Sequence, residues 1–199
     1  MAVASFVLAI VAIIIALASA GYTRRQAVAS ESVTAIEAKR LHVDLTPELA
    51  ITCTAPPGTD IRQADMTLEL TGPAGLDELD EVTVRIRDDM PDRKPRPGSQ
   101  LTQEQISEVI WGPYRLNPAV RGTDSLGRKH GPFRLPKREP YPLPLEQSMA
   151  PSWTSPDQWR DQYQGKPVRL EITCHREGHE PWILRQEAAV KPDPPTHVW

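Results

Sequence analysis

The sequence has few cysteines and few glycines, and both scarcities exclude classes of site. Two cysteines in 199 residues are too few for a disulfide-rich scaffold, and they do not form the C-x-x-C pair of structural zinc sites. The 11 glycines include no phosphate-binding loop and no G-x-S-x-G motif, and no kinase signature is present. The sequence therefore carries no catalytic motif, and we predict no cofactor.

The chain also lacks an excess of charge of one sign. Its 23 basic and 26 acidic residues are interspersed and give a net charge of −3. A nucleic-acid-binding domain usually presents a strongly basic surface, so we predict no nucleic-acid partner. Proline, in contrast, is abundant at 21 residues, and it interrupts long helices and favours short strands joined by shaped loops.

One uncharged, apolar run occupies residues 2–20. A helix of that length rises about 28 Å, close to the roughly 30 Å of a bilayer's hydrocarbon core. We therefore predict a transmembrane anchor over residues 1–23, with the lipid bilayer as its partner and the cell membrane as its location.

The flanking charges predict the orientation of this single span. No Lys or Arg precedes the run, whereas Arg24, Arg25 and Lys39 follow it. Positive charges stay on the cytoplasmic side of short membrane segments, so the body of the chain is predicted to be cytoplasmic. The alternative is a signal peptide cleaved after Ala20, which would export the rest of the chain. The missing basic leader and the length of the run favour the retained anchor.

The remaining sequence divides by its hydrophobic periodicity. Residues 24–40 have helical spacing and contain no Gly or Pro, which predicts a helical stalk. From residue 41 the period changes to two, so a single domain is predicted over residues 41–190, followed by an extended tail over residues 191–199.

Short strands with turn signals between them predict a mainly β domain. Alternating apolar and polar residues mark strands at 41–45, 49–53, 66–70 and 82–86, and less regular ones at 110–116, 128–135, 141–147, 168–175 and 181–190. The last two are expected to form an antiparallel hairpin, because a short connection containing Gly joins them. This arrangement predicts an antiparallel β-sandwich of immunoglobulin-like type.

Two short helices are expected between the strands. Ser155 fits an N-cap with Pro156 at the first helical position, which predicts a helix that ends at Gly165. Thr102 and Gln105 form a capping box for a second helix, although the apolar residues that follow are also compatible with a strand.

Four segments carry a resemblance to a known group of proteins. They are WGPYRLNP at 111–118, GTDSLGR at 122–128, GPFRL at 131–135 and QYQGKPVRLEITCHREG at 162–178. In these segments the chain resembles uncharacterised single-pass membrane proteins of actinobacteria. The resemblance implies an anchor followed by a β-rich domain, and it implies no activity.

The two cysteines lie in similar contexts, LAITCT around Cys53 and LEITCH around Cys174. In an exported domain they could form a disulfide between the sheets. The predicted cytoplasmic location favours two reduced, buried thiols instead.

A metal site is a further candidate around Cys174. Potential ligands near it are His175, Glu177, His179 and Glu180. Adjacent residues of a strand face opposite sides, so Cys174 and His175 are not expected to bind one ion, and we interpret the histidines as surface residues.

Charged and aromatic residues outside the strands supply the remaining candidates. The basic loop residues Arg93, Lys94 and Arg96 are a candidate interaction surface for an anionic partner. Four tryptophans are candidates for a ligand groove, although core positions are their commoner role: Trp111, Trp153, Trp159 and Trp182. The carboxylates of Asp77, Glu78, Asp80, Glu81, Asp88 and Asp89 are interpreted as solvated turn residues.

These observations favour a noncatalytic, membrane-tethered protein-interaction or scaffold module with an unknown protein partner. Two alternatives stay open. One is an exported envelope domain stabilised by a Cys53–Cys174 disulfide, and the other is a metal-dependent enzyme that uses the Cys174 and His179 region.

The retained anchor is testable by N-terminal sequencing of the protein isolated from cell membranes. We expect the sequence to begin at Met1 or Ala2, and the protein to stay in the membrane pellet after an alkaline carbonate wash, because a spanning helix is held by its apolar surface. A sequence that begins Gly-Tyr-Thr-Arg contradicts the anchor, and the predicted location and thiol state depend on the same result.

Overall fold

The computed structural model describes residues 33, 36–55, 63–95 and 98–192, and the chain forms two units, residues 1–44 and 45–199. The predicted anchor, most of the predicted stalk and tail residues 193–199 lie outside the described residues. Among the residues that are described, no helix is both long enough and apolar enough to cross a membrane.

In the first unit, residues 36–44 are helical. The strand predicted at 41–45 is therefore wrong, because the helix of the predicted stalk region continues to residue 44. The side chains of Leu41 and Val43 are 53% and 61% exposed, so their alternation with polar residues does not reflect a buried sheet face. Five alternating residues fit one and a half turns of a helix as well as a short strand, which is why the pattern misled.

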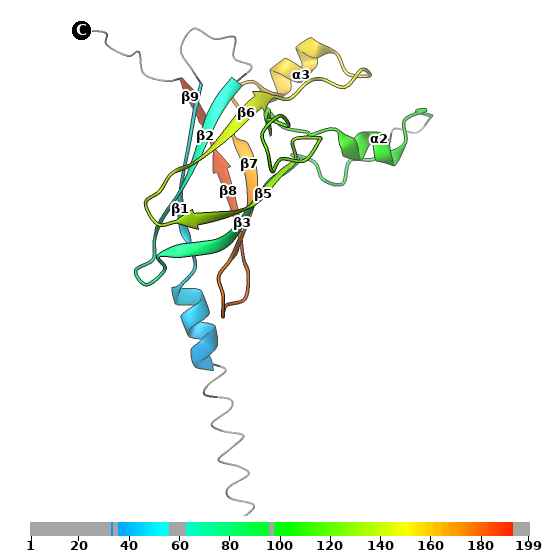
Figure 1. The fold of residues 1–199 in the computed structure, drawn as a ribbon. Helices are drawn as coiled ribbons and strands as arrows, with labels where there is room; N and C mark the ends of the chain where they lie inside the picture. Colours follow the sequence, from blue (N-terminus) through cyan, green and yellow to red (C-terminus); the bar gives the residue numbers. More distant parts are fainter. Residues whose placement is uncertain (1–32, 34–35, 56–62, 96–97, 193–199) are drawn as a thin grey trace, which may run out of the picture. The chain divides into compact units, whose positions relative to one another are not determined.

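The second unit is mainly β, with two sheets that form a β-sandwich (Figure 1). The first sheet has the strand order β4-β6-β2-β1-β9 and the second has the order β5-β3-β7-β8. The elements are β1 (Glu48–Ala55), β2 (Gln63–Gly72), β3 (Glu78–Ile86), α2 (Gln103–Glu108), β4 (Tyr114–Leu116), β5 (Lys129–Pro136), β6 (Tyr141–Gln147), α3 (Pro156–Tyr163), β7 (Val168–His175), β8 (Trp182–Ala188) and β9 (Val190–Pro192). Pairing is antiparallel except between β1 and β9, which run parallel.

The two-residue alternation of the sequence builds the core between the sheets. In β7 the side chains of Val168, Leu170, Ile172 and Cys174 are buried, whereas the residues between them are partly exposed. In β2 the same alternation buries Met66, Leu68 and Leu70 against them. Each fully buried Leu or Met contributes about 1.5–3 kcal/mol relative to an exposed position, so this one cluster is the main source of stability.

Most predicted strands are confirmed, including the β7–β8 hairpin. The bounds of several strands differ from the prediction, and three of these differences change an assignment. The strand expected at 110–116 is only β4, and the one expected at 181–190 is divided into β8 and β9. In addition, β3 begins at Glu78, so Glu78, Asp80 and Glu81 are strand residues rather than turn residues.

Glu78 is held by an arginine of β5 and by the arginine that follows β7. Its carboxylate pairs with Arg134 and with Arg176, and hydrogen bonds from these two guanidinium groups, Arg134 first, lower the pKa of Glu78. Within this acidic run, the charge of Glu78 is therefore compensated by two arginines that are distant from it in the sequence, which the sequence pattern does not show.

The two short helices gather at one end of the sandwich, where β3 ends and β7 begins (Figure 1). The chain enters the sandwich at the other end, because β1 begins opposite the end of β2 at Gly72 and a short turn then leads into β3. The helical end and the entry end are thus separated by the full length of β3.

Two glycines with similar backbone angles allow a controlled test of this packing. Gly127 has a φ of +75°, and a Cβ atom added to it would lie 2.2 Å from the Leu116 carbonyl oxygen. Gly178 has a φ of +80°, with nothing within 4 Å of the added atom. We expect Gly178→Ala to lower the free energy of unfolding by about 1–2 kcal/mol and Gly127→Ala by about 2–5 kcal/mol, because only Gly127 adds a backbone clash to the strained angle. Urea denaturation followed by circular dichroism measures both, and equal losses would contradict the described approach of β4 to Gly127.

Candidate functional site

A second hydrophobic cluster lies outside the sandwich core, between the two short helices. Its buried members are Ile106, Trp111, Trp159 and Tyr163. The rings of Trp111 and Trp159 are 5.3 Å apart and those of Trp159 and Tyr163 are 4.6 Å apart, centroid to centroid. We call α2, α3 and this cluster the helical cap.

Local sequence signals explain why the cap helices form. The predicted capping box of α2 is confirmed, because Thr102 Oγ1 accepts from the Gln105 N–H and the Gln105 side chain accepts from the Thr102 N–H. The predicted helix α3 is also confirmed, with Pro156 in its first turn, but the Ser155 side chain makes no capping hydrogen bond. Indole Nε1 of Trp111 donates to the Ile106 carbonyl at 3.1 Å, which fixes the tryptophan against the end of α2.

An ion pair between Asp88 and Arg128 joins the cap to the sandwich. Arg128 Nη1 lies 2.6 Å from Asp88 Oδ2, and both side chains are less than one fifth exposed, at 13% and 16%. Arg128 Nη2 also donates to the carbonyls of Ser107 and Val109 at the end of α2, while Asp88 Oδ1 accepts from the Trp111 N–H. One charged pair therefore fixes α2 and Trp111 to the residues that follow β3.

The adjacent carboxylate, Asp89, performs the same task for α3. Its Oδ2 accepts from the Tyr163 hydroxyl at 2.9 Å and from Gln162 Nε2 at 3.0 Å. Burial, and next the hydrogen bond to Asp89, raise the pKa of Tyr163, so its hydroxyl keeps its proton and acts as a donor at neutral pH. The prediction that Asp88 and Asp89 are solvated turn residues is therefore wrong.

The predicted basic loop contributes to the cap unequally. Arg93 lies over the Trp111 ring, with its guanidinium carbon 3.7 Å from the ring centroid, and its Nη2 is 3.8 Å from Asp89 Oδ1. Lys94 is exposed, and within the described part of the chain no acidic side chain pairs with it. Arg96 lies outside the described residues. Arg93 is thus a packing residue, and Lys94 is the described member of the loop that offers a free charge.

Two hollows flank Trp111 and Gln162, which line both of them. The first hollow has a volume of about 360 Å³ and lies between the end of β3, α3 and the start of β7. The second hollow has a volume of about 450 Å³ and is lined by Lys94, Trp153 and Gln158 among other residues. These volumes are at the small end of the range for ligand sites, and their walls mix apolar, aromatic and charged groups as binding sites do.

The structure brings only part of the predicted tryptophan groove together. Trp111 and Trp153 both line the second hollow, and Trp153 is 40% exposed. Trp159 is buried within the cap, and Trp182 belongs to the sandwich core. Among the four, Trp153 is therefore the tryptophan that offers most of its surface to a partner.

The cysteines are placed as two buried, free thiols. Cys53 lies on β1 of one sheet and Cys174 on β7 of the other. Burial raises the pKa of Cys53 to about 11 and the pKa of Cys174 to about 12. Both thiols are therefore protonated at neutral pH, and a thiol without its thiolate form is a poor nucleophile and a poor metal ligand.

The candidate metal ligands near Cys174 are not brought together. Cys174 faces the core, whereas His175 is exposed on the other side of β7. His179 packs against the Trp182 ring, with the ring centroids 5.5 Å apart. Within the described ranges, no three His, Cys, Asp or Glu side chains are close enough to share an ion.

One buried histidine was missed by the sequence reasoning. His130 Nδ1 lies 2.8 Å from Thr123 Oγ1, and its Nε2 lies 3.2 Å from the Tyr141 hydroxyl. Burial lowers the pKa of His130, so the imidazole is neutral near pH 7 and the cluster is a satisfied polar contact inside the sandwich. The sequence places His130 in a predicted strand but contains no sign of its partners.

No family model matches this chain, and no curated protein matches its sequence significantly. The geometry of the cap is therefore the basis for assigning a function.

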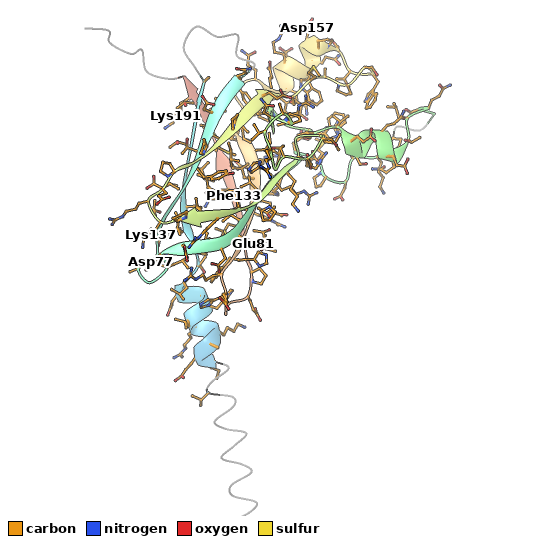
Figure 2. The ribbon with its side chains drawn as sticks, viewed as in Figure 1. Asp77, Glu81, Phe133, Lys137, Asp157 and Lys191 are labelled. Atoms are coloured by element: carbon orange, nitrogen blue, oxygen red, sulfur yellow. The ribbon has the colours of Figure 1, made fainter. Side chains whose placement is uncertain are left out.

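Substitution of Arg128 tests whether the ion pair holds the cap in place. We expect Arg128→Ala to lower the free energy of unfolding by about 2–4 kcal/mol, because it leaves Asp88 and two carbonyls at the end of α2 without their donor. Arg160→Ala is the matched control, since its pair with Asp157 on α3 is exposed, and we expect a change below about 0.5 kcal/mol (Figure 2). Urea denaturation and tryptophan emission measure the two variants. If both lose the same small amount, the ion pair does not anchor the cap.

Proposed function

We propose that this chain is a noncatalytic, membrane-tethered protein-interaction module that binds its partner with the helical cap. The observation that carries the proposal is the pair of hollows beside Trp111, built on side chains that are already fixed by hydrogen bonds and ion pairs. A binding surface that is ordered before the partner arrives loses less conformational entropy on association.

The strand order supports an immunoglobulin-like architecture for this module. Strands β1, β2, β6 and β4 correspond to A, B, E and D of that fold, and β5, β3, β7 and β8 correspond to C′, C, F and G. One difference is that β4 precedes β5 in the chain, whereas D follows C′ in the standard order. By the same correspondence, α2 lies between C and D and α3 lies between E and F, at the end opposite the β2–β3 and β7–β8 connections, which are the B–C and F–G loops.

Exposed apolar side chains around the cap support a protein partner. Met90, Met149 and Trp153 are 55%, 74% and 40% exposed. Met90 lines the first hollow, Trp153 lines the second, and Met149 lines a third hollow of about 610 Å³ beside Trp159 and Arg160. Methionine and tryptophan are enriched at protein interfaces and depleted on ordinary surfaces. Their grouping at one end favours recognition there rather than along the sheets.

The apolar run at residues 2–20 supports the membrane tether and a cytoplasmic domain, for the reasons given by its length and flanking charges. The chain enters the sandwich at the end opposite the cap. A membrane tether concentrates the binding surface at the bilayer.

Cross-linking in membranes, followed by affinity purification of the full-length chain and mass spectrometry, tests this function. We expect a partner that is recovered with the native chain, and recovered at least about fivefold less with Trp153→Ala, because aromatic residues at interfaces commonly contribute more than 1 kcal/mol. The matched control is Ile183→Ala, which removes a side chain that is 64% exposed on β8, outside the cap.

The control variant is expected to recover the partner at the native level. If every recovered protein is the same for Trp153→Ala, Ile183→Ala and the native chain, the cap is not the interaction surface.

A further inference from the structure

We propose that the first hollow receives an acidic segment of the protein partner, with one carboxylate bound by Arg87 and Lys166 and a neighbouring apolar side chain in the hollow. This inference rests on the proposed function and names the chemistry of the partner.

Two arginines stand directly opposite each other at the rim of the first hollow. The register of β3 and β7 pairs Ile86 with Leu170, so Arg87 is the cross-strand neighbour of Arg169. The Arg87 N–H donates to the Arg169 carbonyl at 2.8 Å, which fixes that pairing beyond the end of β3. Arg169 is paired with Glu187, so Arg87 is the member of this arginine pair that an anion can bind.

The other arginines of this sheet face are already neutralised. Glu171 lies between Arg85 and Arg185, at 3.9 Å and 3.3 Å, and Glu187 lies 3.2 Å from Arg169. For Arg87, in contrast, no acidic partner exists within the described residues, and Lys166 from the α3–β7 connection is equally without one. Two uncompensated cations therefore line one hollow in a chain whose net charge is −3.

The carboxylate that lines the same hollow does not cancel this charge. Asp89 accepts hydrogen bonds from Tyr163 and Gln162 and lies 3.8 Å from the Arg93 guanidinium. The hydrogen bonds and the ion pair of Asp89 are thus made with α3 and with Arg93. The preferred ligand is an anion that Arg87 and Lys166 bind directly.

The rest of the wall is apolar and aromatic. Met90, Trp111, Pro113 and Pro167 line the hollow together with the two cations. A volume of about 360 Å³ is sufficient for one large apolar side chain beside a carboxylate. A small carboxylate without an apolar group would contact only the two cations and leave the apolar residues of the wall without a contact. The wall therefore favours an anion that carries an apolar group.

The second hollow favours a chain over a small molecule. It shares Trp111 and Gln162 with the first hollow, and Lys94 adds another uncompensated cation to its wall. A peptide that extends from one hollow to the other places a second acidic residue near Lys94. Electrostatic complementarity of this kind increases the association rate and selects against basic partners.

Fluorescence anisotropy with the full-length chain in detergent tests the proposal. The probe is a fluorescein-labelled peptide of alternating Glu and Leu, and the comparison peptide has Gln in place of Glu. We expect the Glu peptide to bind, and Arg87→Glu and Lys166→Glu each to raise its Kd about tenfold or more, because each replaces an attractive contact with a repulsive one. The matched control is Lys191→Glu on β9 of the other sheet, for which we expect less than about a twofold change (Figure 2).

Equal binding of the Glu and Gln peptides, no binding of either, or unchanged affinity of Arg87→Glu and Lys166→Glu would overturn the proposal. Free glutamate and unlabelled Glu peptide are then compared as competitors at equal carboxylate concentration. If free glutamate displaces the probe as well as the peptide does, the hollow is a small-molecule site and the proposal is overturned. If Trp153→Ala still lowers the recovery of a partner in the cross-linking experiment, the proposed interaction function holds even when the acidic-segment proposal fails. The two failures are therefore distinguishable.

Discussion

The ion pair of Asp88 and Arg128 is the interaction on which the described architecture of the cap depends. A six-residue helix such as α2 is too short to be stable alone, and its stability comes from tertiary contacts. Arg128 donates hydrogen bonds to two carbonyls at the end of α2 and to the carboxylate of Asp88, and the same carboxylate accepts a hydrogen bond from the Trp111 N–H. Once Trp111 is fixed, Trp159 and Tyr163 have a surface to pack against, and the two hollows acquire their common wall.

The fold was largely predictable because local patterns determine it. Alternation in β1, β2, β3 and β7 reports directly which side chains face the core, and the capping box of α2 is a local signal. The same rule failed at residues 41–45, where alternation occurs on a helix with exposed apolar residues. A short alternating pattern is therefore informative only when other strands are available to bury it.

The candidate site was much less predictable, because its contacts join residues that are distant in sequence. Arg128 pairs with Asp88 across 40 positions, and Tyr163 reaches Asp89 across 74. From the sequence, both carboxylates look like solvated turn residues, and nothing distinguishes Arg87 from the other arginines in and beside the strands. Arg93 and the tryptophans were identified as candidates because residue type alone marks them, but burial and pairing decided which of them are accessible.

Asp88 and Asp89 are consecutive residues, and one anchors α2 while the other anchors α3. Both carboxylates follow directly after β3, so the two helices are fastened to a single backbone segment. A register slip of one residue in β3 would displace both carboxylates and detach both helices together. The attachment of both cap helices therefore depends on the correct register of β3 in its sheet.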